Sequence, residues 1–323
     1  MSVVLVTGAN GFVGQHLCRL LAKHGHAVRC AVRDPRTMPV NSEYEVVTIG
    51  DIGADTDWRS ALQNVDQVVH LAARVHVMEE TELDSLAEFR RVNTIGSAKL
   101  AESAAAARVQ RFIYVSSIKV HGEKTDGSPF RSSDRVAPTD PYAISKLEAE
   151  EALDQLARES AFELVILRPS LIYGPGVGGN FLRAMKIVDK RIPIPLGLIK
   201  NARSMLAVHN LCDLIQVCLE HPAAARRIFL AADGIDMSTS DLFRKLGKHM
   251  GKPARLVPVP HQLLVLGGKM FRRSNEVARL CDSLQVNIET TKDVLNWSPP
   301  IPIDDAIQAT VDWYVGMERQ SFD

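Results

Sequence analysis

The sequence predicts an α/β protein with a doubly wound parallel sheet and a smaller, mostly C-terminal lobe. Short apolar runs alternate with helical patterns over the first 170 residues, as in sheets that helices cover on both faces. A glycine-rich turn joins the first apolar run to the first helical pattern. Beyond residue 170 the alternation breaks, and glycine and proline become frequent, which is typical of loops.

Each predicted element follows from its own run of residues. Six apolar runs bounded by turn residues are expected to form strands, at residues 3–6, 26–32, 43–49, 67–72, 111–117 and 162–169. Helical periodicity predicts helices at about 12–24, 83–107 and 142–159, and a later run at 227–232 is expected to return to the sheet. We therefore expect a nucleotide-binding domain of residues 1–170 plus about 204–232. The smaller lobe would take about 171–203 and 233–323.

Composition excludes several classes of protein. The 323 residues include 38 basic and 38 acidic ones, so no basic excess indicates a nucleic-acid partner. The longest apolar stretches, such as 263–268, are far too short for a membrane span, and no signal-peptide pattern precedes the first strand. The five cysteines show no paired spacing for zinc or for a disulfide framework. We therefore expect a cytoplasmic protein with no metal site and no membrane insertion.

The glycine-rich turn predicts a phosphate-binding loop. VVLVTGANGFVG puts Gly8, Gly11 and Gly14 directly after a strand and at the start of a helix. The first glycine permits the tight turn, the second a close approach of the pyrophosphate, and the third close packing of helix and strand. Free N–H groups at the helix start face the phosphates. A Rossmann-type dinucleotide site is therefore expected, and its loop also contains Asn10, Phe12 and Val13.

The end of the second strand bears on the choice of cofactor. In AVRDPR the acidic residue that usually holds the adenosine ribose is replaced by Val32, and Arg33 follows. Valine cannot accept hydrogen bonds from ribose hydroxyls, whereas Arg33 can pair with a 2′-phosphate. The stretch therefore favours NADP(H). NAD(H) stays open, because Asp34 can reach a bare ribose if the turn bends inward.

A tyrosine and a lysine four residues apart form the candidate catalytic pair. PYAISK places Tyr142 and Lys146 on one face of a predicted helix. A nearby ammonium stabilises a phenolate, so we expect the pKa of Tyr142 to fall from about 10 toward neutrality. A tyrosine tuned in this way can transfer a proton. Two serines, Ser116 and Ser117, end the preceding strand.

These motifs, in this order, resemble the extended short-chain dehydrogenase/reductases, also called the NAD-dependent epimerase/dehydratase family. The likeness spans nearly the whole chain, through TGANGFVG, HLAA, VNTIGS, RFIYVSSIKVHGE, PYAISKLEAE, LRPSLIYGPG and LNWSPPIPIDDAIQATVDWY. It indicates the branch that modifies nucleotide-activated sugars. LAARVHVMEE, FRRVNTIGS and SSIKVHGEKTDGSPF resemble bacterial surface-polysaccharide (O-antigen) enzymes. Those enzymes are described as UDP-glucose 4-epimerase-like proteins or as 4-keto reductases that form UDP-N-acetylquinovosamine.

The resemblance implies roles for individual residues. Tyr142 would be the general acid or base at the sugar oxygen, and Lys146 would tune it and hold the nicotinamide ribose. Ser117 would hydrogen-bond the reacting oxygen, with Ser116 the weaker candidate. The other cofactor residues that the resemblance implies are Asp51, near the adenine, Ile52, Leu71, Ala72, Ala73, Asn93, in the structural asparagine position, and Pro169.

Further residues are candidates for the substrate site. Asn180, after two glycines, and Arg203 occupy positions that resemble diphosphate and sugar contacts of nucleotide-sugar enzymes. An arginine can bind a diphosphate with two parallel hydrogen bonds. Arg272 or its neighbour Arg273 could supply a second phosphate contact, and His121 could touch the sugar. The resemblance also implies a homodimer, formed through the helices at 83–107 and 142–159.

Four functions remain open on these residues. The first is a reductase that delivers a nicotinamide hydride to C4 of a UDP-4-keto-6-deoxy-N-acetylhexosamine while Tyr142 protonates O4. The second is a UDP-hexose or UDP-N-acetylhexosamine C4 epimerase that keeps NAD tightly bound. A non-catalytic dinucleotide-binding protein would not need Ser117, Tyr142 and Lys146. A reductase of a non-nucleotide ketone fits the bacterial-type motifs less well. The preference for NADP(H) favours the first.

Overall fold

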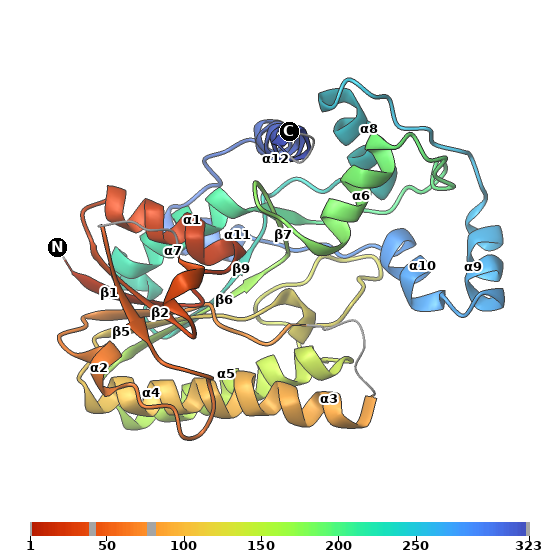
Figure 1. The fold of residues 1–323 in the computed structure, drawn as a ribbon. Coiled ribbons are helices and arrows are strands. Elements are labelled where there is room, and N and C mark those ends of the chain that lie inside the picture. Colours follow the sequence, from red (N-terminus) through yellow and green to blue (C-terminus); the bar gives the residue numbers. More distant parts are fainter. Residues whose placement is uncertain (1, 39–42, 76–81, 321–323) are drawn as a thin grey trace.

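The computed structural model describes residues 2–38, 43–75 and 82–320 (Figure 1). A seven-stranded, all-parallel sheet with the order β3-β2-β1-β4-β5-β6-β9 forms its centre. The strands are β1 (Val3–Thr7), β2 (Ala27–Val32), β3 (Tyr44–Thr48), β4 (Gln67–His70), β5 (Arg111–Val115), β6 (Glu163–Pro169) and β9 (Arg227–Ala231). The predicted Rossmann-type α/β fold is confirmed, including the return of the late strand to the sheet edge.

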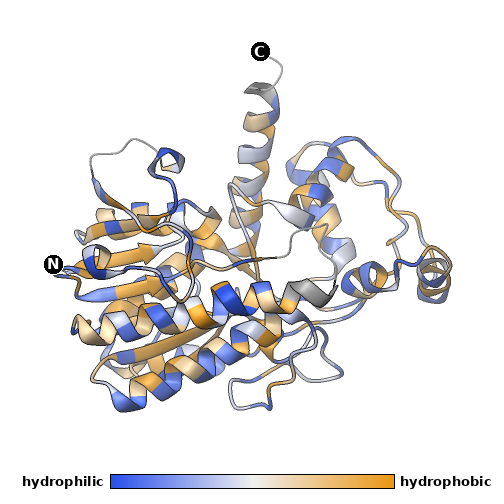
Figure 2. Ribbon diagram, turned by 60° about the horizontal axis from the view of Figure 1, so that its bottom comes forward, coloured by the Kyte–Doolittle hydropathy of each residue, from blue (hydrophilic) through white to orange (hydrophobic). Residues whose placement is uncertain are grey.

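Helices cover both faces of this sheet, as the alternation of side chains requires. One face carries α1 (Phe12–Lys23), α7 (Val208–Glu220) and α11 (Glu289–Leu295), and the other α2 (Arg59–Leu62), α4 (Gly96–Ala106) and α5 (Pro141–Glu159). Within β1, Val4 and Val6 join the first core and Leu5 the second. Figure 2 shows the strands as an apolar layer between helices of mixed hydropathy.

The predicted long helix at 83–107 is interrupted by a wider turn. It consists of α3 (Glu82–Phe89), a π-helical segment η2 (Arg90–Ile95) and α4. Asn93 lies in η2 and is 1% exposed. Such π-turns occur frequently at functional sites. Short 3-10 turns complete the sheet domain at η1 (Pro35–Thr37), η3 (Ile118–Val120) and η4 (Pro222–Ala224).

The smaller lobe has its own apolar core. It contains a two-stranded parallel sheet, β7 (Leu171–Tyr173) with β8 (Met205–Ala207), and the helices α6 (Gly179–Asp189), α8 (Thr239–His249), α9 (His261–Met270), α10 (Ser274–Cys281) and α12 (Ile303–Gln320). Side chains from the small sheet, α6, α8 and α12 form this core, among them Tyr173, Phe181, Met185, Phe243 and Ile307. Leu295 and Trp297, by contrast, join the core of the large sheet. The exact domain boundaries stay a prediction.

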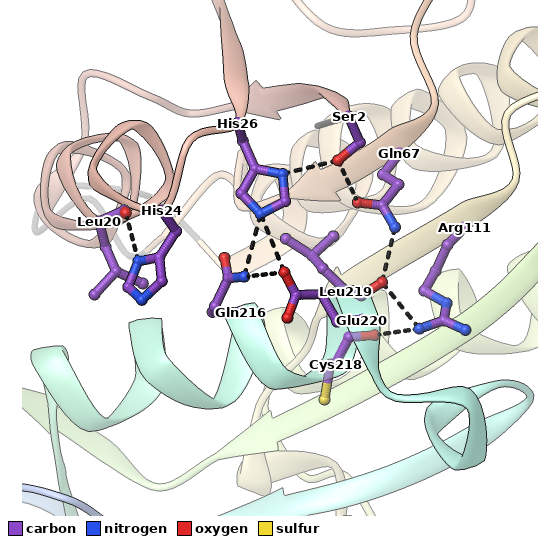
Figure 3. Close-up of polar contacts among 10 residues, drawn as sticks. All are labelled: Ser2, Leu20, His24, His26, Gln67, Arg111, Gln216, Cys218, Leu219 and Glu220. Atoms are coloured by element: carbon purple, nitrogen blue, oxygen red, sulfur yellow. Dashed lines mark hydrogen bonds and ion pairs between the residues drawn. The ribbon is translucent and has the colours of Figure 1, made fainter.

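A group of hydrogen bonds, which we call the polar seam, ties the end of α7 to the amino ends of β4 and β5 (Figure 3). Arg111 Nη1 donates to the carbonyl oxygens of Cys218 and Leu219, at 2.8 and 3.0 Å, where α7 ends. Gln67 Nε2 donates to the Leu219 carbonyl at 2.7 Å. These carbonyls have no partner within their helix, so the seam fixes α7 against β4 and β5. The opposite, carboxyl edge of the sheet is left for a ligand.

No helix among the described residues is long and apolar enough to span a membrane. Across 2–38, 43–75 and 82–320, no cluster of histidine, cysteine or carboxylate side chains could hold a metal ion.

Candidate active site

The glycine loop has the geometry that a dinucleotide phosphate needs. Gly8 has φ +66°, and a Cβ there would lie 2.9 Å from the backbone nitrogen of Ala72. A Cβ on Gly14 would lie 2.2 Å from the Gly8 carbonyl oxygen. Gly11 is the N-cap of α1, and within the described part of the chain no side chain caps this helix end. Its first N–H groups, at Phe12, Val13 and Gly14, are thus available to an anion.

We predict that Gly8→Ala destabilises the protein far more than Gly25→Ala. Both glycines have a positive φ, but a Cβ on Gly25 would meet nothing within 4 Å among the described atoms. Gly25→Ala should therefore cost only the left-handed backbone strain, about 1–2 kcal/mol. Gly8→Ala adds a backbone clash and should cost about 2–5 kcal/mol. Urea unfolding of both variants measures the difference, and equal losses would refute the close approach to Ala72.

Hydrogen bonds hold the segment after β4 beside this loop. Thr7 Oγ1 lies 2.6 Å from His70 Nδ1 and accepts from the Ala72 N–H at 3.2 Å. His70 Nε2 lies 2.8 Å from Ser97 Oγ. Burial lowers the pKa of His70 to about 3, so the imidazole is neutral and can share these two bonds. The segment that contains the predicted cofactor residues Leu71, Ala72 and Ala73 is therefore tied to the end of β1 and is half-buried.

Asn93 links this segment to α5, the catalytic helix, which contains Tyr142 and Lys146. Its Oδ1 accepts from the Arg74 N–H at 2.8 Å, and its Nδ2 donates to the Arg74 carbonyl at 3.1 Å and to Ser145 Oγ at 3.0 Å. These bonds saturate its donors and one acceptor lone pair. Asn93 was predicted among the cofactor contacts, but at 1% exposure it is a positioning residue. The π-turn of η2 is what brings it to both partners.

Two of the predicted catalytic residues, Ser117 and Lys146, lie at the carboxyl end of β5. Lys146 Nζ donates to the Val115 carbonyl at 2.8 Å and lies 4.1 Å from the centre of the Tyr114 ring. Ser117 is the N-cap of η3 and is half-buried, whereas Ser116 is 4% exposed. An ion pair between Lys119 and Asp140, at 2.5 Å, ties η3 to the N-terminus of α5, where Tyr142 lies. The Tyr142 ring packs edge-on against Phe89, with centroids 6.1 Å apart.

The expected lowering of the Tyr142 pKa is not found. Burial, together with the charge of Asp140, raises the pKa of Tyr142 to about 12. Lys146 itself is buried, which lowers its pKa to about 7, although the Glu150 carboxylate opposes that shift. The helical spacing gave the correct shared face, but it could not show how much solvent the fold removes from both groups. The phenol is therefore protonated at neutral pH in this structure.

The structure brings two of the predicted cofactor residues together at the adenosine end. Arg33 Nη1 lies 3.4 Å from Asp51 Oδ1, and both side chains are about three-quarters exposed. Asp34 caps η1 and pairs with Arg36 at 2.7 Å, so it does not bend inward to a ribose. Val32 and Ile52 are buried. Arg33 and Asp51, predicted at different parts of the cofactor, thus form one exposed ion pair.

His121 is not placed to touch a substrate. It is 3% exposed, its ring stacks on Phe130 with centroids 5.3 Å apart, and its Nε2 lies 2.8 Å from Arg168 Nη1. Because arginine only donates, this nitrogen is the acceptor, and burial next to the Arg168 charge lowers the pKa of His121 to about 4. Arg168 also forms an ion pair with Glu150, which lies one helical turn after Lys146. The buried side chains of His121, Arg168 and Glu150 are thus linked in series. Arg168 lies in β6 directly before Pro169, the last residue of that strand.

The structure brings a second arginine, Arg279, close to the surroundings of Arg203, one of the predicted substrate residues. Arg203 is mostly buried, donates from Nη1 to the Asp282 carbonyl at 3.0 Å, and interacts with the charge of Glu123. Glu123 also lies 3.8 Å from Arg279 Nη2 on α10. Arg272 is exposed in the turn between α9 and α10, and Asn180 is exposed in the first turn of α6. No motif in the sequence singles out Arg279, because its neighbourhood depends on how α10 packs.

Comparisons with known proteins show what the chain is similar to. The model of the NAD dependent epimerase/dehydratase family matches residues 4–232. A UDP-glucose 4-epimerase of Vibrio cholerae is 44% identical over 310 residues, 95% of this chain and 94% of that protein. The N-acetyl-α-D-glucosaminyl-diphospho-ditrans,octacis-undecaprenol 4-epimerase of Escherichia coli O157:H7 is 26% identical over 273 residues, 83% of this chain and 78% of that protein. A solved UDP-glucuronic acid 4-epimerase of Bacillus cereus in complex with NAD superposes with a TM-score of 0.79 at 21% identity, over 98% of this chain and 99% of that chain.

Proposed function

Because the chain belongs to the NAD dependent epimerase/dehydratase family, we propose that it is a nucleotide-sugar C4 epimerase that keeps NAD bound. The observation that carries this proposal is the 44% identity to a UDP-glucose 4-epimerase over 95% of the chain. The position of Ser117 and Lys146 at the end of β5, with Tyr142 one turn before Lys146 on α5, supports it. UDP-hexoses and UDP-N-acetylhexosamines are the proposed substrates.

We assign the proton-transfer chemistry to Tyr142. A bound nicotinamide supplies the acceptor and donor of the C4 hydride. Tyr142 Oη exchanges a proton with the sugar O4, Ser117 holds O4 in place, and the Lys146 ammonium binds the nicotinamide ribose. An oxidised nicotinamide is positively charged, which would lower the raised pKa of Tyr142. The reaction direction in which Tyr142 first accepts the proton of O4 would then become accessible at neutral pH.

Arg203 and Arg279 are the proposed diphosphate contacts, and Asn180 stays a proposed substrate contact. Both arginines lie beside Glu123, which a diphosphate would displace as their partner. Guanidinium groups suit this role because they bind phosphate with two parallel hydrogen bonds. The sequence-based proposals of a homodimer and of a cytoplasmic location stay predictions.

A specific observation keeps the 4-keto reductase as a second candidate. Val32 stands where an acidic ribose ligand is usual, and Arg33 follows it at the exposed edge. The raised pKa of Tyr142 also gives a protonated phenol, which is the form that donates to O4 during reduction. Several neighbours of known structure, among them the UDP-glucuronic acid 4-epimerase of Bacillus cereus, are complexes with NAD, which favours the epimerase.

We predict that protein purified without added cofactor releases NAD, rather than NADP, on denaturation. Arg33→Ala should then change NAD retention less than about threefold, because an arginine that is 75% exposed adds little to a bare ribose. Chromatography of the released nucleotide checks both statements. Release of NADP that disappears in Arg33→Ala would support the reductase instead.

Activity assays separate the two functions directly. We expect UDP-GlcNAc and UDP-GalNAc, or UDP-glucose and UDP-galactose, to interconvert without added nucleotide. A matched assay supplies UDP-4-keto-6-deoxy-GlcNAc with NADPH or NADH and follows the absorbance of the reduced nucleotide. Rapid consumption of reduced nucleotide, with no interconversion of either sugar pair, would overturn the epimerase proposal.

A further inference from the structure

The helical hairpin of α9 and α10 exposes an unusual amount of apolar surface. Leu263, Leu266, Met270 and Phe271 are 57%, 63%, 71% and 69% exposed. The first three are spaced at i, i+3 and i+7 and therefore share one face of α9, and Phe271 follows the helix directly as its C-cap. Figure 1 shows α9 at the outer end of the smaller lobe, far from the sheet. Clustered, exposed large side chains of this kind indicate an interaction surface.

The inner side of α9 is accounted for by α10. Gly268 is buried, and a Cβ there would lie 2.8 Å from Val277 of α10. Leu264 packs against the core of the smaller lobe. Leu263, Leu266 and Met270 lie on the side of α9 away from these contacts. Together with the exposed Phe271 at the end of the helix, they form what we call the α9 face.

Positive charge accompanies the α9 face. Residues 261–275 contain three basic residues, Lys269, Arg272 and Arg273, and no acidic residue, in a chain whose formal net charge is zero. All three are exposed beside the α9 face, and Glu276, the next residue in the sequence, lies 3.6 Å from Arg273. A short helix with apolar side chains on one face and basic residues beside them is typical of helices that lie at a membrane surface.

The positive charge beside the α9 face also distinguishes between a second copy of the chain and a lipid surface as its binding partner. In a two-fold dimer the same patch meets itself, so a second copy would bring these basic residues together, and like charges across an interface are unfavourable. An anionic lipid surface attracts the same residues, by about 1 kcal/mol for each one near the headgroups. The pattern therefore favours anionic phospholipid over a second copy.

We propose that the α9 face docks on the surface of a membrane that contains anionic phospholipid, without crossing it. The apolar side chains would enter the boundary between headgroups and acyl chains, and the basic residues would contact lipid phosphates. The end of α10 is fixed to the candidate substrate site, because Arg203 donates to the Asp282 carbonyl and Asn201 Nδ2 to the Leu280 carbonyl. Through α10, the α9 face is therefore connected to the candidate substrate site.

Vesicle flotation of the full-length protein tests this proposal independently of its activity. Wild type is expected to float with vesicles of phosphatidylcholine and phosphatidylglycerol, and to bind vesicles of phosphatidylcholine alone at least tenfold more weakly. Lys269→Gln with Arg273→Gln should weaken binding to the mixed vesicles on the order of twentyfold. Leu266→Gln with Phe271→Gln should weaken binding to both vesicle types by more than tenfold.

The matched control is Val46→Gln. Val46 is 38% exposed on β3 at the far edge of the sheet, so this variant should bind like wild type. The substituted α9 side chains are exposed, so thermal unfolding of each variant should match wild type. The proposal is wrong if wild type does not float, or if it binds both vesicle types equally. It is also wrong if wild type is a dimer that Leu266→Gln with Phe271→Gln dissociates, since a second copy then covers the face.

Discussion

Replacing Tyr142 with phenylalanine is expected to lower kcat for C4 epimerisation by roughly 10²–10⁴-fold, the contribution of a positioned proton donor or acceptor. The change removes only the hydroxyl, which is the group that exchanges a proton with O4. It leaves the ring that packs edge-on against Phe89, so folding should be preserved. Steady-state kinetics of the purified variant measure the loss.

The control for Tyr142→Phe is its stability and its cofactor content. Thermal unfolding and the amount of retained dinucleotide should match wild type, because Lys146, which we assign to the ribose, is held by the Val115 carbonyl and by the face of the Tyr114 ring. Full activity of Tyr142→Phe would contradict the proton-transfer role. A variant that unfolds would instead show that the hydroxyl has a structural role.

Glu150→Leu is expected to be the most destabilising single change on the catalytic helix, by about 3–5 kcal/mol. Glu150 and Arg168 are about 4–5% exposed and form an ion pair, with Glu150 Oε1 3.1 Å from Arg168 Nε. Removing the carboxylate leaves a buried guanidinium whose remaining side-chain neighbour is His121, at 2.8 Å. Urea unfolding gives the free-energy difference from wild type.

An ion pair on the same helix provides the matched control. Asp154 and Arg158 form an exposed pair four residues apart, where solvent screens the charges. Asp154→Ala should therefore leave the urea midpoint nearly unchanged. Equal shifts of the urea midpoint for Glu150→Leu and Asp154→Ala would contradict the conclusion that the buried ion pair of Glu150 with Arg168 stabilises the fold.

Much of the fold could be predicted because it depends on local patterns. Apolar runs mark the strands, and the glycines of the first turn are required by the backbone itself, as the contact from Gly8 to Ala72 shows. The π-turn at Asn93 was not predictable from periodicity, since partners distant in sequence, Arg74 and Ser145, stabilise it.

The errors at the site arise from long-range contacts. His121 has the residue type of a substrate contact, but Arg168, 47 residues away in sequence, and Phe130 enclose it. The pKa of Tyr142 depends on how deeply α5 is buried, which the spacing from Tyr142 to Lys146 does not report. Arg279 lies near Arg203 only because α10 packs there through Asn201. Sequence patterns identify chemical groups, whereas their solvation is set by the packed fold.

The fate of the C4 hydrogen shows whether the protein epimerises C4 of a nucleotide sugar with a bound nicotinamide. A UDP-sugar with deuterium at C4 is incubated with the enzyme in ordinary water, without added nucleotide, and the epimer is analysed by NMR and mass spectrometry. If the hydride leaves C4 and returns to the other face within one site, the epimer keeps its deuterium. Loss of deuterium to solvent, or no epimer at all together with turnover of a 4-keto sugar and reduced nucleotide, would contradict the account.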